Sequence, residues 1–380
     1  MSGKDKPRRK KILIACGGSA GHIFPGFSLA EELAERYGNA VRISFITSDS
    51  KLARSLLNES GFDFHTLPVE GFKKRTLREN FNFTAGLLIS SLKSMKILFK
   101  DRPDCFIGFG AYVSGPPFAA ASLLGVPTLI HEQNFVLGKA NRIMRYFATR
   151  IAYSFPKCVR FKKEKTVITG NPIRKGIVKS GNRNNSIDFL GLDRNKFTIL
   201  VMGGSQGSRM INLTVIDAFK HMENKLREAV QVIHISGSGD YERLGKEYKG
   251  IDVRYKLYPF FKDMGVIYDT ADMSISRAGS SAIFELCASK IPAVLIPYPF
   301  AGGHQVRNAG FLASMNAAIM IEEKSFSGAA LYSAIARLLK DGKLRESMKE
   351  KAGFLAAPDA ARRLADEVGS LAGLNRAGIS

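Results

Sequence analysis

Short apolar runs alternate with longer amphipathic segments along most of this chain. The first run, residues 12–16, leads through a glycine turn into a segment where Leu29, Ala30 and Leu33 recur with helical spacing. Further runs of strand length lie at residues 41–47, 105–109, 127–130, 151–153, 166–168, 197–202, 230–236, 253–258, 273–276 and 291–297. Helical spacing returns at residues 77–99, 305–312, 329–339, 344–357 and 359–371. This order of strand, turn and helix predicts an α/β fold with parallel sheets.

The pattern restarts once, in the middle of the chain. Residues 197–202 precede GGSQGSRMIN, just as residues 12–16 precede GGSAGHIFPG. The intervening residues 176–196 are polar and weakly periodic, so we predict a linker and surface loop there. The 380 residues also exceed the ~250–300 at which a single core stops growing. We therefore expect two domains of similar plan, residues 1–173 and 174–358.

A glycine turn in the second half is a candidate phosphate site. The predicted strand at 273–276 runs into Gly279, and we expect Ser280 or Ser281 to cap the helix that follows. Free backbone N–H groups at a helix start attract an anion. The turn therefore suits a phosphate group.

Three polar residues nearby suit the rest of a nucleotide sugar. Glu285 lies about one turn into the same helix, and a carboxylate accepts hydrogen bonds well from two ribose hydroxyls. His304 and Gln305 follow a glycine pair and offer both donors and acceptors to sugar hydroxyls. The stretch predicts a nucleotide-sugar pocket.

The first half has candidate groups of its own. His22 follows the first glycine turn, and its imidazole is either a general base or a cap or buried structural histidine. The run at 127–130 ends in HEQN, where ligands bind in open α/β sheets. The glycine turns match neither the dinucleotide fingerprint nor the phosphate-loop motif, which argues against an oxidoreductase or a regulatory nucleotide module.

Charge and cysteine usage narrow the class further. Lys and Arg number 56 against 34 Asp and Glu, a net charge of +22. This excess predicts an anionic partner or reflects a general basic bias. Nucleic acid is not favoured, because the chain has no tryptophan and no basic-aromatic motif. Four scattered cysteines without a C-x-x-C pair argue against disulfides and zinc, and no apolar run reaches the ~20 residues of a membrane span.

Residues 71–102 combine an apolar stripe with cations. Leu77, Phe81, Ala85, Leu88, Leu92, Met95 and Phe99 recur at helical spacing, and we expect them to face the core. Phe72, Phe83 and Leu87 are left over beside Lys73, Lys74, Arg75 and Arg78. Such a surface attracts an anionic membrane, although a buried helix after a solvated charge run explains the pattern equally well.

Taken together, the motifs resemble the MurG-type glycosyltransferases of peptidoglycan synthesis. The motifs that carry the resemblance are GGSAGHIFPG, GFGAYVSGPP, HEQNFVLGKANR, TGNPIR, GGSQGSRMIN, ISRAGSSAIFEL and YPFAGGHQVRNA, in this order from residue 12 to 312. The resemblance implies the GT-B architecture, in which two Rossmann-like doubly wound domains face each other across a cleft. It also implies that the C-terminal segment, residues 359–380, packs back on the first domain.

The resemblance further implies transfer of GlcNAc from UDP-GlcNAc to the MurNAc 4-hydroxyl of lipid I, giving lipid II with inverted configuration. The enzyme would sit peripherally on the cytoplasmic face of the inner membrane, with other cell-wall synthesis proteins as further partners. A glycolipid synthase or a UDP-GlcNAc 2-epimerase of the same fold is the alternative. The HEQN segment and the turn at 108–115 favour lipid I as the acceptor.

The family's functional residues carry over onto matching positions. The implied donor site contains Ser205 at the diphosphate, Phe261 at the uracil, Ser280, Ser281, Ala282, Ile283 and Phe284 at the helix start, Glu285 at the ribose, and His304 and Gln305 at the GlcNAc. Ser19, Ala20, Gly21, Asn134 and Arg174 would close over the donor. Gly17, Gly18, Gly110, Tyr112 and Ser114 would receive the acceptor diphosphate. His22 is the candidate base and Glu132 or a water its competitor.

Two features bear on the mechanism. The first turn often has the sequence GGTGGH in this family, whereas this chain has Ser19 and Ala20 at the third and fourth positions. Alanine is compatible with this turn only if the φ of Ala20 is not positive. No Asp-x-Asp motif is present to hold a metal beside the leaving diphosphate. We therefore expect no metal and no cofactor, and expect helix N-termini with Arg174 or Arg277 to take up the charge.

Overall fold

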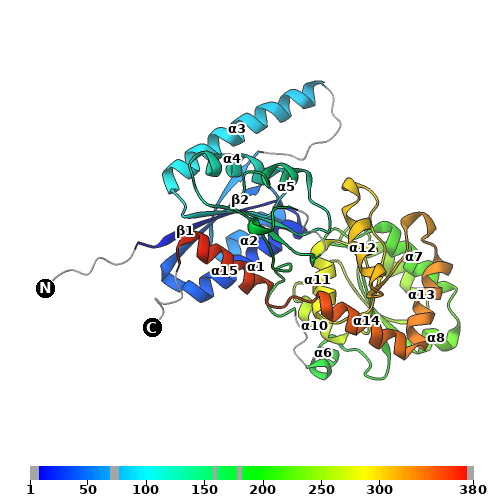
Figure 1. The fold of residues 1–380 in the computed structure, drawn as a ribbon. Coiled ribbons are helices and arrows are strands. Elements are labelled where there is room, and N and C mark those ends of the chain that lie inside the picture. Colours follow the sequence, from blue (N-terminus) through cyan, green and yellow to red (C-terminus); the bar gives the residue numbers. More distant parts are fainter. Residues whose placement is uncertain (1–7, 69–76, 157–160, 178–181, 375–380) are drawn as a thin grey trace. The chain divides into compact units, whose positions relative to one another are not determined.

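The computed structural model describes residues 8–68, 77–156, 161–177 and 182–374 (Figure 1). The chain divides into two compact units. The first contains residues 1–174 together with 359–380, and the second contains residues 175–358. The chain thus leaves the first unit once and returns to it at the end.

The first unit is built on a seven-stranded sheet whose paired strands are all parallel. Its strands are β1 (Lys10–Cys16), β2 (Val41–Ser48), β3 (Asp63–Leu67), β4 (Cys105–Gly108), β5 (Thr128–Glu132), β6 (Arg150–Tyr153) and β7 (Thr166–Ile168). They lie in the order β3-β2-β1-β4-β5-β6-β7. Successive strands are added toward one edge of the sheet from β1 to β3 and toward the other edge from β4 to β7. This change of side lies between β1 and β4, and a doubly wound sheet binds ligands at such a point.

Helices cover both faces of this sheet and bury two apolar cores. They are α1 (Ala20–Tyr37), α2 (Lys51–Ser60), α3 (Leu77–Asp101), α4 (Gly115–Leu123), α5 (Lys139–Met144) and α15 (Ala360–Ala372), with short 3-10 turns η1 (Gly38–Ala40), η2 (Tyr112–Ser114) and η4 (Lys163–Lys165). The terminal helix α15 packs on α1, and its Leu364 and Val368 share a core with Leu29 and Leu33 (Figure 1).

The second unit repeats the plan with a six-stranded parallel sheet. Its strands are β8 (Phe197–Met202), β9 (Val230–Ile235), β10 (Arg254–Tyr258), β11 (Met273–Ser276), β12 (Ala293–Leu295) and β13 (Ala318–Met320). The order β10-β9-β8-β11-β12-β13 places the reversal between β8 and β11. The prediction of two Rossmann-like domains is therefore confirmed.

The helices of the second unit flank this sheet and bury one continuous core around Ile199, Val232 and Ile275. They are α6 (Arg183–Leu190), α7 (Arg209–Lys220), α8 (Asn224–Glu228), α9 (Tyr241–Lys249), α10 (Met264–Thr270), α11 (Ser280–Ala288), α12 (His304–Ser314), α13 (Gly328–Lys340) and α14 (Gly342–Leu355), with the 3-10 turns η5 (Ala301–Gly303) and η6 (Glu323–Ser325).

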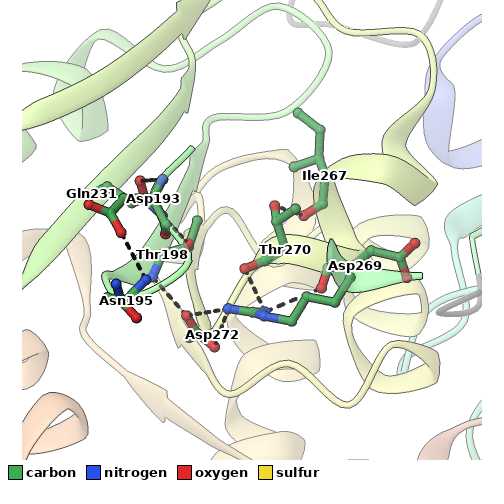
Figure 2. Close-up of polar contacts among 9 residues, drawn as sticks. Asp193, Asn195, Thr198, Gln231, Ile267, Asp269, Thr270 and Asp272 are labelled. Carbon is green, nitrogen blue, oxygen red and sulfur yellow. Dashed lines mark hydrogen bonds and ion pairs between the residues drawn. The ribbon is translucent and has the colours of Figure 1, made fainter. Parts of the chain in front are cut away.

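The expectation of a linker and loop over residues 176–196 is wrong in its middle, where α6 forms. Ile187 and Leu190 lie one turn apart and are buried. Arg183 anchors the helix with a two-pronged ion pair to Asp272, at 2.9 and 3.0 Å, and donates 2.7 Å to the carbonyl of Thr270 (Figure 2). The third apolar residue of the helix, Phe189, is 76% exposed, so the periodic signal in this short polar segment is too weak to predict the helix.

The orientation predicted for α3 is wrong at three positions, although Met95 packs against the core as expected. Leu88, Leu92 and Phe99 were expected in the core but are 62%, 65% and 63% exposed. Ser90 and Ser94 are fully buried instead, and α3 packs against α4 (Figure 1). Small side chains let two helices approach closely, so the apolar stripe is left on the surface.

Candidate active site

Two glycine loops meet at the reversal point of the first sheet. The loop after β1 contains Gly17, and a Cβ built there would lie 2.7 Å from the Cβ of Ala111 in the loop after β4. Ala111 itself has a φ of 59° and a ψ of 165°, a conformation that glycine favours and that costs about 1–3 kcal/mol for another residue. Only glycine at position 17 fits a contact this close.

Serines at the end of β2 hold the first loop from its other side. The backbone N–H of Gly18 donates to the Ser48 hydroxyl, and the Ser50 hydroxyl donates to the Gly18 carbonyl, both over 3.0 Å. A Cβ at Gly18 would come within 2.3 Å of the Ser50 oxygen. These serines were not predicted, because nothing in their own sequence context marks them.

The first loop ends in the start of α1, with Ser19 at the N-cap and Ala20 as the first helical residue. Ser19 is exposed and makes no side-chain capping hydrogen bond. The helical backbone of Ala20 has a negative φ, so the departure from the glycine-rich family pattern does not strain the turn. Gly21 follows in the first turn of α1, where backbone N–H groups point out of the helix end.

His22 lies in the first turn of α1 and contacts the end of β4. Its Nδ1 is 2.8 Å from the carbonyl oxygen of Phe109. A carbonyl can only accept, so Nδ1 carries the proton and the neutral ring keeps its lone pair on Nε2. This tautomer is the one that a general base requires.

Glu132, the competing candidate for the base, accepts hydrogen bonds at both carboxylate oxygens. It is 1% exposed, and its Oε1 accepts from the backbone and side-chain nitrogens of Asn134 at 3.0 and 3.2 Å. Its Oε2 accepts from the Gly138 N–H at 2.8 Å and from Asn141 Nδ2 at 2.9 Å. Donors engage both oxygens of Glu132, so the carboxylate holds the loop after β5 and Asn134 in place, and its candidacy as the base stays a prediction.

The second glycine loop also has an internal support. Ser114 is fully buried, and its hydroxyl lies within hydrogen-bonding distance of the carbonyls of Gly110 and Ala15. Ser114 therefore holds the loop closed, and its predicted contact with a diphosphate stays a prediction. The same loop contains Gly110, which has a φ of 74°, and Tyr112, which is half-buried. Their predicted contact with the acceptor diphosphate stays a prediction.

In the second unit, the loop after β8 is packed so tightly that side chains are excluded. A Cβ at Gly203 would lie 2.2 Å from the Ser208 nitrogen, and one at Gly207 would lie 2.0 Å from the Ser236 carbonyl oxygen. Between these glycines Ser205 is exposed at the loop tip. The loop thus presents Ser205 and its own backbone, as a diphosphate-binding turn requires.

The neighbouring strand β11 ends in the start of α11. Gly279 is the N-cap and Ser280 the first helical residue, and neither serine caps the helix, contrary to prediction. Ser280 is buried, and the Ser281 hydroxyl is buried without a partner among the described residues. The helix start is therefore left to an external acceptor.

The next residues of α11 divide between core and site. Ile283 and Phe284 are buried in the unit, at 1% and 2% exposure, so their contribution to a ligand is limited to the backbone. Ala282 is half-buried between them and Ser281. Glu285 is 4% exposed, and its Oε2 accepts from the Tyr268 hydroxyl over 2.9 Å.

Gln305 ties two strand ends together. Its Oε1 accepts from the backbone nitrogens of Ala278 at 3.2 Å and Tyr298 at 3.0 Å, which leaves its amide NH₂ to donate to a sugar. His304 begins α12 beside it, with a buried Nδ1 that has no partner among the described residues. We predicted that Gln305 would offer both a donor and an acceptor to a sugar. Because its oxygen is already used, it can offer only the amide donor.

The two cations expected to assist the leaving group are both engaged. Arg277 pairs with Glu323 over 2.9 Å, and the same Nη2 donates 2.9 Å to the Ser208 hydroxyl. It therefore braces the end of the loop after β8. Arg174 belongs to the first unit, one residue beyond the predicted boundary, and its guanidinium lies 4.5 Å from the centre of the Phe24 ring.

The predicted uracil contact lies after β10. Phe261 is half-buried and packs edge-on against Tyr258, with ring centres 4.8 Å apart. The described residues contain no group of three His, Cys, Asp or Glu side chains arranged to hold a metal ion. None of the described helices is both long and apolar enough to cross a bilayer.

Two doubly wound units, each with a glycine loop beside a helix start at its reversal point, form an architecture that suits a nucleotide-sugar enzyme, and the family models identify the class as a glycosyltransferase. Residues 12–153 match the glycosyltransferase family 28 N-terminal domain, and residues 198–364 match the family's C-terminal domain. The chain belongs to glycosyltransferase family 28.

Relatives with established names are similar in sequence to this chain over nearly its whole length. A protein of Halothermothrix orenii is 37% identical over 92% of this chain and 95% of its own length. One of Thermodesulfovibrio yellowstonii is 34% identical over 95% and 98%. Both are named UDP-N-acetylglucosamine–N-acetylmuramyl-(pentapeptide) pyrophosphoryl-undecaprenol N-acetylglucosamine transferase.

Solved structures share the architecture. The crystal structure of MurG from Acinetobacter baumannii superposes with a TM-score of 0.74 at 25% identity, covering 96% of this chain and all of that one. A UDP-N-acetylglucosamine 2-epimerase superposes with a TM-score of 0.69 at 14% identity, covering 97% and 98%, which reflects a common fold alone.

Proposed function

We propose that the protein transfers GlcNAc from UDP-GlcNAc to the MurNAc 4-hydroxyl of lipid I and forms lipid II with inverted configuration. The observation that carries this proposal is the 2.8 Å distance between Nδ1 of His22 and the Phe109 carbonyl oxygen, from which we infer that the ring proton lies on Nδ1. A ring held this way offers Nε2 to an attacking hydroxyl, at the end of a sheet edged by glycine loops. The near full-length relatives named above are transferases of this kind.

The second unit binds the donor. The start of α11 and the loop around Ser205 present backbone N–H groups to the diphosphate, and Glu285 accepts the ribose hydroxyls. The half-buried Phe261 lies against the uracil. Gln305 donates to a GlcNAc hydroxyl through the amide nitrogen that its backbone contacts do not use.

The first unit binds the acceptor and starts the reaction. The lipid diphosphate lies in the two glycine loops around Gly18 and Gly110, which have no room for side chains at their closest approach. The 4-hydroxyl oxygen attacks C1 of GlcNAc and gives its proton to Nε2 of His22. The bond from C1 to the diphosphate oxygen breaks at the same time, and UDP leaves with the electron pair. The helix starts compensate its charge without a metal ion.

The surface of the first unit suits an anionic membrane that carries the acceptor. Leu87, Leu88, Ile89 and Leu92 are 40–65% exposed on α3, and exposed Lys93, Lys96 and Lys100 share the helix. Ile143, Tyr146 and Phe147 are also exposed at the end of α5, beside Arg142 and Arg145. Apolar groups among cations enter the interface while the cations meet anionic headgroups. We propose that this surface holds the enzyme on the cytoplasmic face of the membrane. Lys73, Lys74 and Arg75, also predicted to take part, lie outside the described residues.

The direct test is transfer itself. The purified protein is incubated with UDP-GlcNAc labelled in the sugar and with lipid I in detergent micelles. The expected product is labelled lipid carrying a β-linked disaccharide, with one UDP released for each GlcNAc transferred. Release of free GlcNAc or formation of UDP-ManNAc, with no labelled lipid, would contradict the proposal.

A further inference from the structure

The carbonyl that orients His22 also accepts a second hydrogen bond. Nε2 of Gln133 donates to the Phe109 oxygen over 3.0 Å, while Nδ1 of His22 donates to the same oxygen over 2.8 Å. Gln133 comes from the end of β5 and is 1% exposed. Two side chains from different elements therefore converge on one backbone oxygen.

This oxygen needs such a restraint because of its place in the backbone. The N–H of Phe109 is fixed by a 2.8 Å hydrogen bond to the Ala15 carbonyl. The following peptide, however, leads into Gly110 with a φ of 74° and Ala111 with a φ of 59°. Next to a glycine the peptide plane can rotate at little cost, so strand pairing alone does not fix where this carbonyl points.

We propose that Gln133 is a positioning residue for the transfer reaction, which holds the Phe109 carbonyl so that His22 keeps its ring orientation and tautomer. The inference rests on the proposed role of His22 as the base. The His131 carbonyl, 3.3 Å from Gln133 Nε2, and the 5.2 Å packing of the Phe109 ring on the His131 ring fix Gln133 and Phe109 to the same strand end. When the imidazole takes the proton, its bond to the oriented carbonyl becomes charge-assisted and stronger.

The experiment is a double-mutant cycle on the full-length protein with His22→Ala, Gln133→Met and the double variant. Methionine keeps the length of glutamine and removes its donor. Gln133→Met is expected to lower kcat about 10- to 100-fold, because the base is misplaced, and to change both KM values less than about twofold. The double variant is expected to be no slower than His22→Ala, because Gln133 has nothing left to orient.

A matched control separates positioning from general destabilisation. Gln231→Met in the second unit also removes a buried glutamine, one that donates to Thr198 and to the Asp193 carbonyl (Figure 2). It should lower the thermal midpoint with kcat nearly unchanged. Gln133→Asn, which withdraws the amide by one methylene, serves if the Met variant does not fold, and the same loss of kcat is expected.

Fold-losses that multiply in the double variant, or a kcat near wild type for Gln133→Met, would overturn the positioning role while leaving His22 as the base. Near-normal turnover of His22→Ala would overturn the base assignment, and the inference with it. Turnover of the His22→Ala variant distinguishes these two failures.

Discussion

The hydroxyl of Tyr268 donates to Oε2 of Glu285 over 2.9 Å, and both side chains are almost fully buried. Tyr268 lies on α10 and Glu285 on α11, so the bond fixes the carboxylate from a neighbouring helix. We expect Tyr268→Phe to weaken UDP-GlcNAc binding by about 1 kcal/mol, with kcat little changed, because the carboxylate loses its orientation. Calorimetric titration with UDP-GlcNAc measures this, and unchanged affinity would limit Tyr268 to packing.

Glu285→Ala removes the proposed ribose acceptor itself. Loss of a charged acceptor should weaken UDP-GlcNAc binding by about 1–3 kcal/mol, more than the loss at Tyr268. The 2′-deoxy donor provides the control, since it should bind the variant and the parent more equally than UDP-GlcNAc does. If the variant discriminates against the deoxy donor as strongly as the parent, the ribose assignment is wrong.

His22→Ala should lower turnover about 10²- to 10⁴-fold. Binding of UDP-GlcNAc, measured in the absence of acceptor, should stay within about twofold because the donor lies on the other unit. The fall in parental turnover at acid pH, where a histidine base is protonated, should be absent from the variant. Near-normal turnover would assign the base to a water, since the Glu132 oxygens already accept from Asn134, Gly138 and Asn141.

Turnover should not depend on an added metal ion. The charge of departing UDP meets helix N-termini, and the sequence has no Asp-x-Asp motif to hold a divalent cation. Dialysis against EDTA followed by assay in chelator should leave kcat unchanged. A strict requirement for Mg²⁺ would remove this account of charge compensation.

The surface on α3 predicts a measurable affinity for lipid. Leu88→Glu with Leu92→Glu should reduce co-sedimentation with anionic vesicles by about tenfold or more, because charged side chains cannot enter the interface. Phe354→Glu in the second unit, where the phenylalanine is 71% exposed, is the matched control and should bind as the parent does. Equal loss in both variants would mean that charge alone governs binding.

Acid should destabilise both units through buried histidines. Burial lowers the pKa of His131 to about 4 and that of His234 to about 3, whereas an unfolded histidine titrates near 6.5. Between these values the unfolded chain binds more protons, so the free energy of unfolding falls as the pH drops from about 6.5, by up to ~1.4 kcal/mol per pH unit for each histidine. Urea unfolding at several pH values checks this. His234→Gln should flatten the dependence for the second unit.

The repeated strand, glycine turn and helix were predictable because each is a local signal. Gly17 and Gly203 mark turns where a Cβ would meet the Cβ of Ala111 or the backbone of Ser208, and such glycines can be recognised in the sequence. The ends of parallel strands then gave the neighbourhood of His22 and Glu285 without any knowledge of the packing. This is why the fold was predictable, whereas the location of both candidate subsites stays a prediction.

What each polar group does there depended on contacts that no local pattern encodes. The sequence does not show that Glu132 accepts four hydrogen bonds within its own unit. Nor does it show that Arg277 is paired with Glu323 and donates to Ser208. Periodicity likewise revealed an apolar stripe on α3, but it did not reveal that Ser90 and Ser94 are fully buried. Pairing and burial are set by residues distant in sequence.

The return of α15 to the first unit has a consequence for synthesis. Leu364 and Val368 complete the core that Leu29 and Leu33 begin, so the amino-terminal unit stays unfinished until the last turn of α15 has left the ribosome. The second unit, translated in between, can close its own core earlier. Nascent chains arrested before residue 360 should therefore present the earlier-made half, not the later one, to chaperones and proteases.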